Sequence, residues 1–372
     1  MTGNWQREFV SVESATAKRH GAGFYPCQGL YYSPTGAKAT TALIATHYNG
    51  DFSEHYCAEY LAERGYGFLG WNTRYRGNEA FFLLEHALVD IAAGVNWLKE
   101  EAGVEQVVIL GNSGGGSLMG AYQSQAAGVT MTATPGLQLP EALHDLTPAD
   151  LYISLCAHPG RPEVLTAWLD PSITDESEPT SVDPSLNMYD PDNAPPYTAE
   201  FIERYRAAQV ERNNRITQWC HDELARLQEL QRFDRAFDLH RSWADLRFMD
   251  GNLDPSERAV GRCYAGNPEA ANYGPRGLGL TNTLRTWLSM WSLQDSHCRG
   301  VPHLNRINVP ALVLQSTADV GVFPSDAKAI YDALGSVDKT LTMIPGDHYL
   351  ETPTTARNDM ADLIVGWLRE HA

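Results

Sequence analysis

Short runs of apolar residues alternate with amphipathic stretches at the two ends of the chain. The apolar runs predict buried β-strands at residues 9–12, 29–32, 42–46, 67–70, 107–110, 151–155, 311–315 and 340–344. Between them, apolar side chains recur at three- and four-residue steps, which predicts helices over residues 53–64, 81–101, 324–334 and 355–369. Strands that alternate with helices favour an α/β fold with a mostly parallel, doubly wound sheet.

The segment between residues 159 and 306 has a different pattern. Residues 170–196 are rich in Pro, Asp and Ser and predict loop, whereas residues 198–248 have a strongly helix-forming composition with an apolar stripe. A short aromatic helix is expected over residues 281–293. A stripe of this kind indicates packing against another helix, either within the chain or across a homodimer.

The most informative motif follows the strand expected at residues 107–110. It reads Gly111-Asn112-Ser113-Gly114-Gly115, a G-x-S-x-G sequence followed by small, helix-compatible residues. A serine hydroxyl is a weak nucleophile at neutral pH, so it must be exposed and placed beside a base. A sharp strand–turn–helix connection provides that exposure, and small neighbours let the strand and the helix pack closely. The alternative is a glycine-rich helix N-terminus that binds a phosphate.

Two groups suited to activating Ser113 follow it in the order that such a site requires, first the acid and then the histidine. Asp319 comes just beyond the strand expected at residues 311–315, and His348 comes in the loop after the strand at 340–344. Catalytic groups of open α/β sheets lie at the carboxyl ends of the strands. We therefore predict that Ser113, Asp319 and His348 form a catalytic triad.

Other carboxylates near these strands are less suited to the role of the acid. Asp347 is a poorer acid than Asp319, because adjacent side chains on an extended segment point apart. Asp145 and Asp150 precede the strand at residues 151–155 and so lie on its wrong side. The structural alternatives are that Asp319 terminates its strand by bonding nearby backbone and that His348 is a packing residue.

With this motif and its partners, the chain resembles the serine-nucleophile branch of the α/β-hydrolase superfamily at both of its ends. The resemblance implies an oxyanion hole made by two backbone N–H groups, one of them from Gly114. The other comes from the loop after the third strand, here His47-Tyr48-Asn49-Gly50, where Tyr48 replaces the usual glycine. By position the second donor is Asn49, with Tyr48 as the nearer alternative.

The resemblance also implies a role for the middle segment. Residues 1–158 and 307–372 correspond to the hydrolase core, and residues 159–306 correspond to a large, mainly helical cap (lid) inserted between the sixth and seventh strands. Such a cap covers the site and excludes water. Its aromatic residues Trp168, Trp287 and Trp291 are expected to bind a bulky apolar substrate, unless they form the interior of the cap itself.

Composition narrows the range of partners. The chain has 372 residues, 43% of them hydrophobic, with a formal net charge of −18 that argues against binding nucleic acid. It contains no apolar run long enough to span a membrane and no N-terminal signal segment. Its six cysteines lack metal-ligand spacing and are expected to be reduced and buried, which favours a cytoplasmic protein.

These patterns together predict a serine hydrolase of the carboxylesterase or lactonase type that uses no cofactor and no metal. Its substrate would be a small molecule, an ester or lactone with a bulky apolar group, cleaved through an acyl-serine intermediate. The same triad also supports hydrolysis of a C–C bond or acyl transfer to an alcohol. An alternative of another class is a non-catalytic binding protein that retains the fold.

Overall fold

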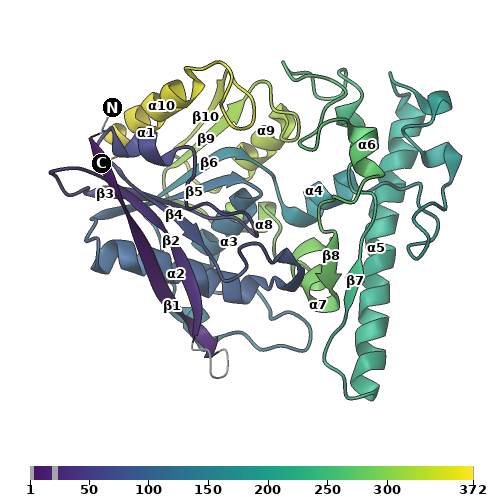
Figure 1. The fold of residues 1–372 in the computed structure, drawn as a ribbon, viewed down its shortest axis with the longest axis horizontal. Coiled ribbons are helices and arrows are strands. Elements are labelled where there is room, and N and C mark those ends of the chain that lie inside the picture. Colours follow the sequence, from purple (N-terminus) through teal and green to yellow (C-terminus); the bar gives the residue numbers. More distant parts are fainter. Residues whose placement is uncertain (1–3, 19–23, 372) are drawn as a thin grey trace.

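The computed structural model describes residues 4–18 and 24–371. Its centre is an eight-stranded sheet with the strand order β1-β2-β4-β3-β5-β6-β9-β10 (Figure 1). Strands β1, β2 and β4 pair antiparallel, and every pair from β4 to β10 along this order is parallel. The strands are β1 (Trp5–Lys18), β2 (Phe24–Pro34), β3 (Thr41–Ala45), β4 (Gly67–Asn72), β5 (Gln106–Ser113), β6 (Leu151–Ala157), β9 (Ala311–Ser316) and β10 (Lys339–Ile344).

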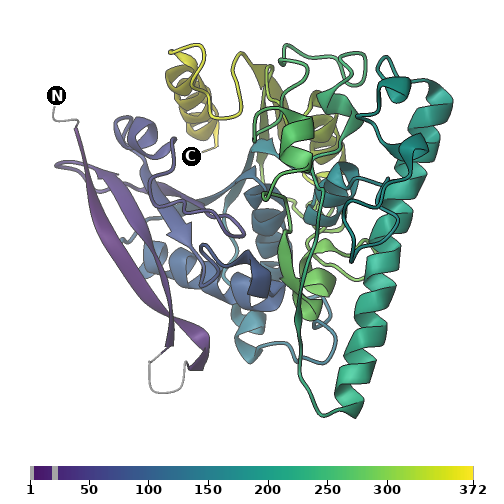
Figure 2. The same cartoon turned by 45° about the vertical axis from the view of Figure 1, so that its right-hand side comes forward.

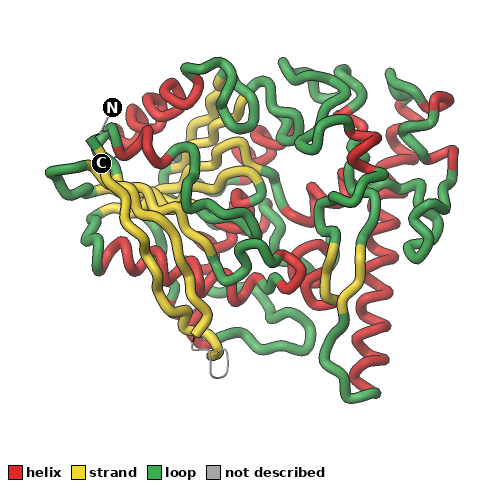
Figure 3. The backbone as a smooth tube through the Cα atoms, viewed as in Figure 1, coloured by secondary structure: helices red, strands yellow, loops and turns green. Residues whose placement is uncertain are grey.

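Helices cover both faces of this sheet, and the alternation of side chains along the strands explains why. In β3, Leu43 packs into the cluster that contains helices α1 and α10, whereas Ile44 packs into the cluster that contains α2 and α3. The two layers are visible around the strands in Figure 3. The helices around the central sheet have the following bounds: α1 (Ala58–Ala62), α2 (Leu84–Glu100), α3 (Gly115–Ala126), α9 (Pro324–Ala333) and α10 (Ala356–Glu370). The predicted doubly wound, mostly parallel sheet is confirmed.

The segment between β6 and β9 lies outside the central sheet, at the right of Figure 1. Loops make up most of this segment, so it is less helical than expected; its regular elements are helices and one two-stranded antiparallel sheet of β7 and β8. Its elements are α4 (Arg161–Trp168), α5 (Ala199–Glu229), β7 (Ala236–Asp238), α6 (Pro268–Asn272), β8 (Thr281–Thr283), α7 (Leu284–Thr286), a π-helix (Trp287–Trp291) and α8 (Val301–Leu304). Short 3-10 helices also occur in the core, at Glu79–Phe81 and Glu141–Asp145, and in this segment, at Pro184–Leu186, Pro191–Asn193 and Leu246–Phe248.

Helix α5 runs along the outer edge of this segment, as Figure 2 shows. Its buried stripe packs within the chain, where Tyr205 donates a hydrogen bond to the carbonyl of Ala244 and Asn213 donates one to the carbonyl of Trp291. Packing inside the chain therefore accounts for the stripe, and a homodimer through this helix stays a prediction.

Several elements differ in extent from the sequence-based expectation. The first two strands are longer, because β1 and β2 pair as a ribbon whose length is fixed by cross-strand hydrogen bonds and not by apolar residues alone. The helix expected over residues 198–248 ends at Glu229, after which Gln231 has a positive φ of 54° that breaks the helical path. The helix expected over 281–293 is divided between β8, α7 and the π-helix.

The cysteines agree with expectation, since all six are free and buried. Within residues 4–18 and 24–371, the helices are all too short or too polar to cross a membrane.

Candidate active site

Ser113 lies at the turn between β5 and α3, in the backbone conformation expected of a nucleophile at such a turn. Its φ is +54°, a left-handed value that is uncommon for a residue other than glycine. The neighbouring glycines allow this turn to sit close to the rest of the sheet. A Cβ on Gly115 would lie 2.2 Å from the carbonyl oxygen of Thr46, and one on Gly116 would lie 2.5 Å from the Cβ of Ala157.

Asp319 and His348 come together at the carboxyl ends of β9 and β10. Nδ1 of His348 lies 2.6 Å from Oδ2 of Asp319, and both side chains are buried. The other carboxylate oxygen, Oδ1, accepts hydrogen bonds from the N–H groups of Gly321 (2.9 Å) and Val322 (3.0 Å). Burial alone would raise the pKa of Asp319, but the charge of His348 and these hydrogen bonds outweigh it and lower the pKa.

Tyr264, from the segment between α5 and α6, completes the surroundings of this pair. Its hydroxyl donates a hydrogen bond to Oδ1 of Asp319 at 2.8 Å and lies 3.0 Å from Nδ1 of His348. Burial and the charge of Asp319 raise the pKa of Tyr264 well above its usual value, so it remains a hydrogen-bond donor at neutral pH. Tyr264 could not be identified from the sequence, since no motif marks it. It lies 55 positions before Asp319 in the sequence, and only folding brings the two together.

His158 connects Ser113 with the Asp319–His348 pair. Its backbone N–H donates to the carbonyl oxygen of Ser113 at 3.0 Å, and its imidazole is close enough to His348 and Asp319 for their charges to act on its pKa. Burial and the positive charge of His348 lower the pKa of His158 well below its ordinary value. Between Ser113 and His348 themselves, no hydrogen bond is present among the described residues; such contacts often tighten only when substrate binds.

The loop after β3 folds back on its own histidine. Nδ1 of His47 accepts hydrogen bonds from the N–H groups of Asn49 (3.3 Å) and Gly50 (3.1 Å), and the side-chain oxygen of Asn49 lies 3.1 Å from the same nitrogen. The two backbone donors at Nδ1 favour the tautomer that carries its hydrogen on Nε2. Burial and the charge of Arg161 lower the pKa of His47 to about 3, so it is neutral at pH 7.

This arrangement changes the assignment of the loop's oxyanion donor. The N–H of Asn49, the donor expected by position, is engaged within the loop. For the N–H groups of Tyr48 and Gly114, no partner is found in the part of the chain that the structure describes. The side chain of Tyr48 points into the interior, where its hydroxyl lies 3.0 Å from Oγ of Ser117.

The three tryptophans expected to bind substrate occupy two different environments. Trp168 lies beside the site, with its ring 5.7 Å from that of His158 and 6.0 Å from that of Tyr264. The ring of Trp291 lies 4.7 Å from the guanidinium of Arg161, which neighbours Gly114. Trp287 instead donates a hydrogen bond to Thr217 of α5 and packs inside the inserted segment, which argues against a role in binding substrate.

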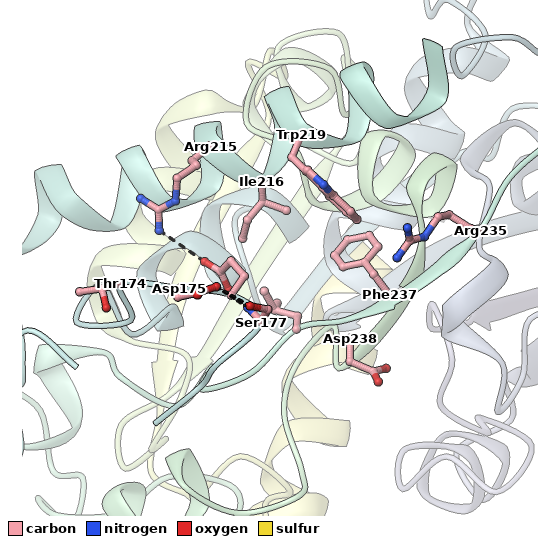
Figure 4. Close-up of a pocket in the computed structure, with 11 residues that line it drawn as sticks. Thr174, Asp175, Ser177, Arg215, Ile216, Trp219, Arg235, Phe237 and Asp238 are labelled. Carbon is pink, nitrogen blue, oxygen red and sulfur yellow. Dashed lines mark hydrogen bonds and ion pairs between the residues drawn. The ribbon is translucent and has the colours of Figure 1, made fainter. Parts of the chain in front are cut away.

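A separate pocket of about 560 Å³ opens elsewhere on the inserted segment (Figure 4). Its apolar wall consists of Ile216, Trp219 and Phe237, and Arg215 and Arg235 flank that wall. All of its lining residues belong to residues 174–177, 215–219 and 235–239, and none of them belongs to the site around Ser113. In the described part of the chain, no cluster of three or more His, Cys, Asp or Glu side chains is arranged to hold a metal ion.

Comparison with known proteins identifies the fold. No protein-family model matches the sequence, and a search of curated proteins finds no match. Among solved structures, DcsB in complex with its substrate analogue is similar at a TM-score of 0.54, with 12% identity over 98% of this chain and 100% of that chain. The α/β hydrolase GrgF from Penicillium sp. sh18 is similar at a TM-score of 0.53, with 12% identity over 98% and 99% of the two chains. The chain therefore has the α/β-hydrolase fold.

Proposed function

We propose that this protein is a serine hydrolase that cleaves a carboxylic ester or a lactone through an acyl-serine intermediate. The observation that carries the proposal is the Asp319–His348 pair, with its 2.6 Å contact, at the same edge of the sheet as a serine held at φ +54°. GrgF, which shares the fold, is an α/β hydrolase, which supports a hydrolytic reaction for this chain. A non-catalytic binding protein would not need all three groups.

The proposed reaction follows from the positions of these groups. Asp319 accepts a hydrogen bond from the N–H at Nδ1 of His348. Nε2 is therefore free to take the proton of Ser113 as the Oγ of Ser113 attacks the substrate carbonyl. The C–O bond to the alcohol then breaks, His348 protonates the departing oxygen, and an acyl-serine remains. Water, deprotonated by His348, attacks that ester and releases the acid and free Ser113.

Two N–H groups are proposed to hold the oxyanion of the tetrahedral intermediates. One is that of Gly114, which precedes α3 and adds the positive end of the helix dipole. The other is that of Tyr48, in preference to Asn49, because the N–H of Asn49 is engaged with His47. Loss of one such donor typically lowers kcat by a factor of about 10²–10³.

We also propose that residues 159–306 act as a cap over a core of residues 1–158 and 307–372. Tyr264 and Trp168 support this, since both come from that segment and lie against the Asp319–His348 pair or its neighbour His158. Their aromatic surface suits an apolar part of the substrate.

Hydrolysis of a C–C bond and acyl transfer use the same groups and remain the alternatives. The six reduced thiols favour a cytoplasmic location.

Replacement of Ser113 by alanine tests the proposal. Hydrolysis of a 4-nitrophenyl ester by Ser113→Ala should fall by several orders of magnitude, while circular dichroism and the melting temperature stay close to those of the wild type. Ser124→Ala is the matched control, since Ser124 is a buried serine of helix α3, which follows Ser113, and its hydroxyl has no hydrogen-bond partner among the described residues. Turnover by Ser113→Ala within tenfold of the wild type would refute the assignment.

A further inference from the structure

Arg161, the first residue of α4, is a buried cation beside Gly114. The residue is 3% exposed, and its guanidinium carbon lies 4.5 Å from the centre of the Tyr48 ring and 4.7 Å from that of Trp291. Its Nη2 pairs with the carboxylate of Glu79. The two aromatic rings and this ion pair hold the guanidinium in one place.

Nη1 of Arg161 lies beside the proposed site of reaction. A Cβ on Gly114 would lie 2.7 Å from Nη1 of Arg161 and 2.7 Å from Nε2 of His47, so both nitrogens adjoin the residue after Ser113. Nη1 makes no hydrogen bond within the described residues, and Nε is buried without a partner. His47 adds a second donor, because its hydrogen is on Nε2.

Buried donors of this kind normally have acceptors. Glu79 accepts from Nη2 of Arg161, whereas Nε is buried without a partner and Nη1 has none within the described residues. Leaving a buried charged group partly unsatisfied is unfavourable in the resting protein. The oxyanion of the reaction exists only briefly and is already provided with the N–H groups of Gly114 and Tyr48. The unsatisfied donors therefore indicate an acceptor that is present on the substrate from the start.

We propose that Arg161, assisted by Nε2–H of His47, binds a carboxylate on the acyl part of the substrate, so that the enzyme prefers half-esters of dicarboxylic acids, or lactones that carry a carboxylate, over neutral esters. This inference rests on the proposed hydrolase function and refines its substrate class. A sequence search for clusters of basic residues misses this site, because it uses a single arginine that becomes an anion site only through burial. The apolar surface of Trp168 then contacts the remainder of the substrate.

The test compares substrates that differ only in the charged group. Benzyl half-esters of succinate, glutarate and adipate would be paired with benzyl esters in which a methyl ketone replaces the distal carboxyl group, and the release of benzyl alcohol measured. The wild type should favour at least one half-ester in kcat/KM by about ten- to hundredfold, the range typical of a charge-assisted hydrogen bond. Arg161→Gln should bring the ratio of kcat/KM between each half-ester and its ketone ester close to one, mainly through a higher KM for the half-ester.

Arg299→Gln is the matched control. Arg299 pairs with Glu163, which lies on the helix that carries Arg161, and removing the charge of Arg299 should leave the preference intact.

A second measurement needs no variant: free glutarate or adipate should inhibit hydrolysis of a neutral ester competitively in the wild type. Three results would overturn the inference: no half-ester preferred by the wild type, no such inhibition, or an equal fall in kcat for both substrate classes in Arg161→Gln. The last would make Arg161 an oxyanion donor instead. If the hydrolase function itself is wrong, neutral esters are not turned over either, which separates the two failures.

Discussion

Replacement of Asp319 by asparagine should disable the site through a change of tautomer at His348. Oδ1 of Asp319 accepts three hydrogen bonds, from the N–H groups of Gly321 and Val322 and from the hydroxyl of Tyr264. An asparagine would keep its carbonyl oxygen at that position, which places its NH2 group where Oδ2 now lies, 2.6 Å from Nδ1 of His348. Two N–H donors cannot face each other, so Nδ1 must become the acceptor and the hydrogen must move to Nε2.

With its hydrogen on Nε2, His348 cannot take the proton of Ser113. In serine hydrolases with this arrangement, the same substitution lowers kcat by about 10⁴-fold, which corresponds to about 5.4 kcal/mol of transition-state stabilisation at 1.36 kcal/mol per decade. We expect a loss of that size in kcat for Asp319→Asn, measured with 4-nitrophenyl butyrate at pH 7.5. Because the three bonds to the carbonyl oxygen persist, the melting temperature should change little.

Asp347→Asn provides the control for Asp319→Asn. It removes the same charge from the residue next to His348, but that carboxylate accepts only from N–H groups of its own exposed loop, at Tyr349, Glu351 and Thr352. Its kcat should fall far less than that of Asp319→Asn, since the Asp347 carboxylate bonds the loop backbone and accepts no hydrogen bond from His348 within the described residues. A loss smaller than tenfold in Asp319→Asn, or an equally large loss in Asp347→Asn, would refute the reasoning.

Two further predictions concern the cap and pH. Trp168→Ala should raise KM for a bulky ester more than for an acetate ester, whereas Trp287→Ala should destabilise the fold by about 3–5 kcal/mol without changing this selectivity; equal selectivity changes in both variants would contradict their placement. The free energy of unfolding should fall from pH 6.5 to pH 5 by more than about 1.4 kcal/mol per pH unit. The reason is that burial lowers the pKa values of His47 to about 3 and of His55 and His303 to about 4, so these groups take up protons near pH 6.5 only when the protein unfolds. Chemical denaturation at several pH values measures this slope, and a flat profile would show that these imidazoles are not buried as neutral groups.

The sequence was sufficient for those parts of the fold and site that local patterns determine. Apolar runs located the parallel strands, and the G-x-S-x-G turn with Asp319 and His348 could be placed because each follows a strand directly. The contacts of Tyr264 and Arg161 were not predictable, because they depend on how a long inserted segment folds back on the core. Trp287 and Trp291 looked alike in sequence, and only the π-helix that turns one toward α5 and leaves the other against Arg161 separates them.

The structure favours Tyr48 over Asn49 as the second donor for a local reason that sequence does not show. The imidazole of His47, two residues before it, folds onto the backbone of the same loop and engages the N–H of Asn49. Positional analogy with a His-Gly loop cannot predict this, since Tyr48 replaces the glycine and its side chain is anchored on Ser117 of α3.

The central claim, that Ser113 is the nucleophile, is tested most directly by covalent labelling with a fluorophosphonate. Intact mass should increase by one adduct per chain, and peptide mapping should place that adduct on Ser113. Ser124→Ala should be labelled like the wild type, whereas Ser113→Ala should remain unlabelled. An adduct on a different residue, or the absence of any adduct in a preparation that hydrolyses esters, would contradict the account.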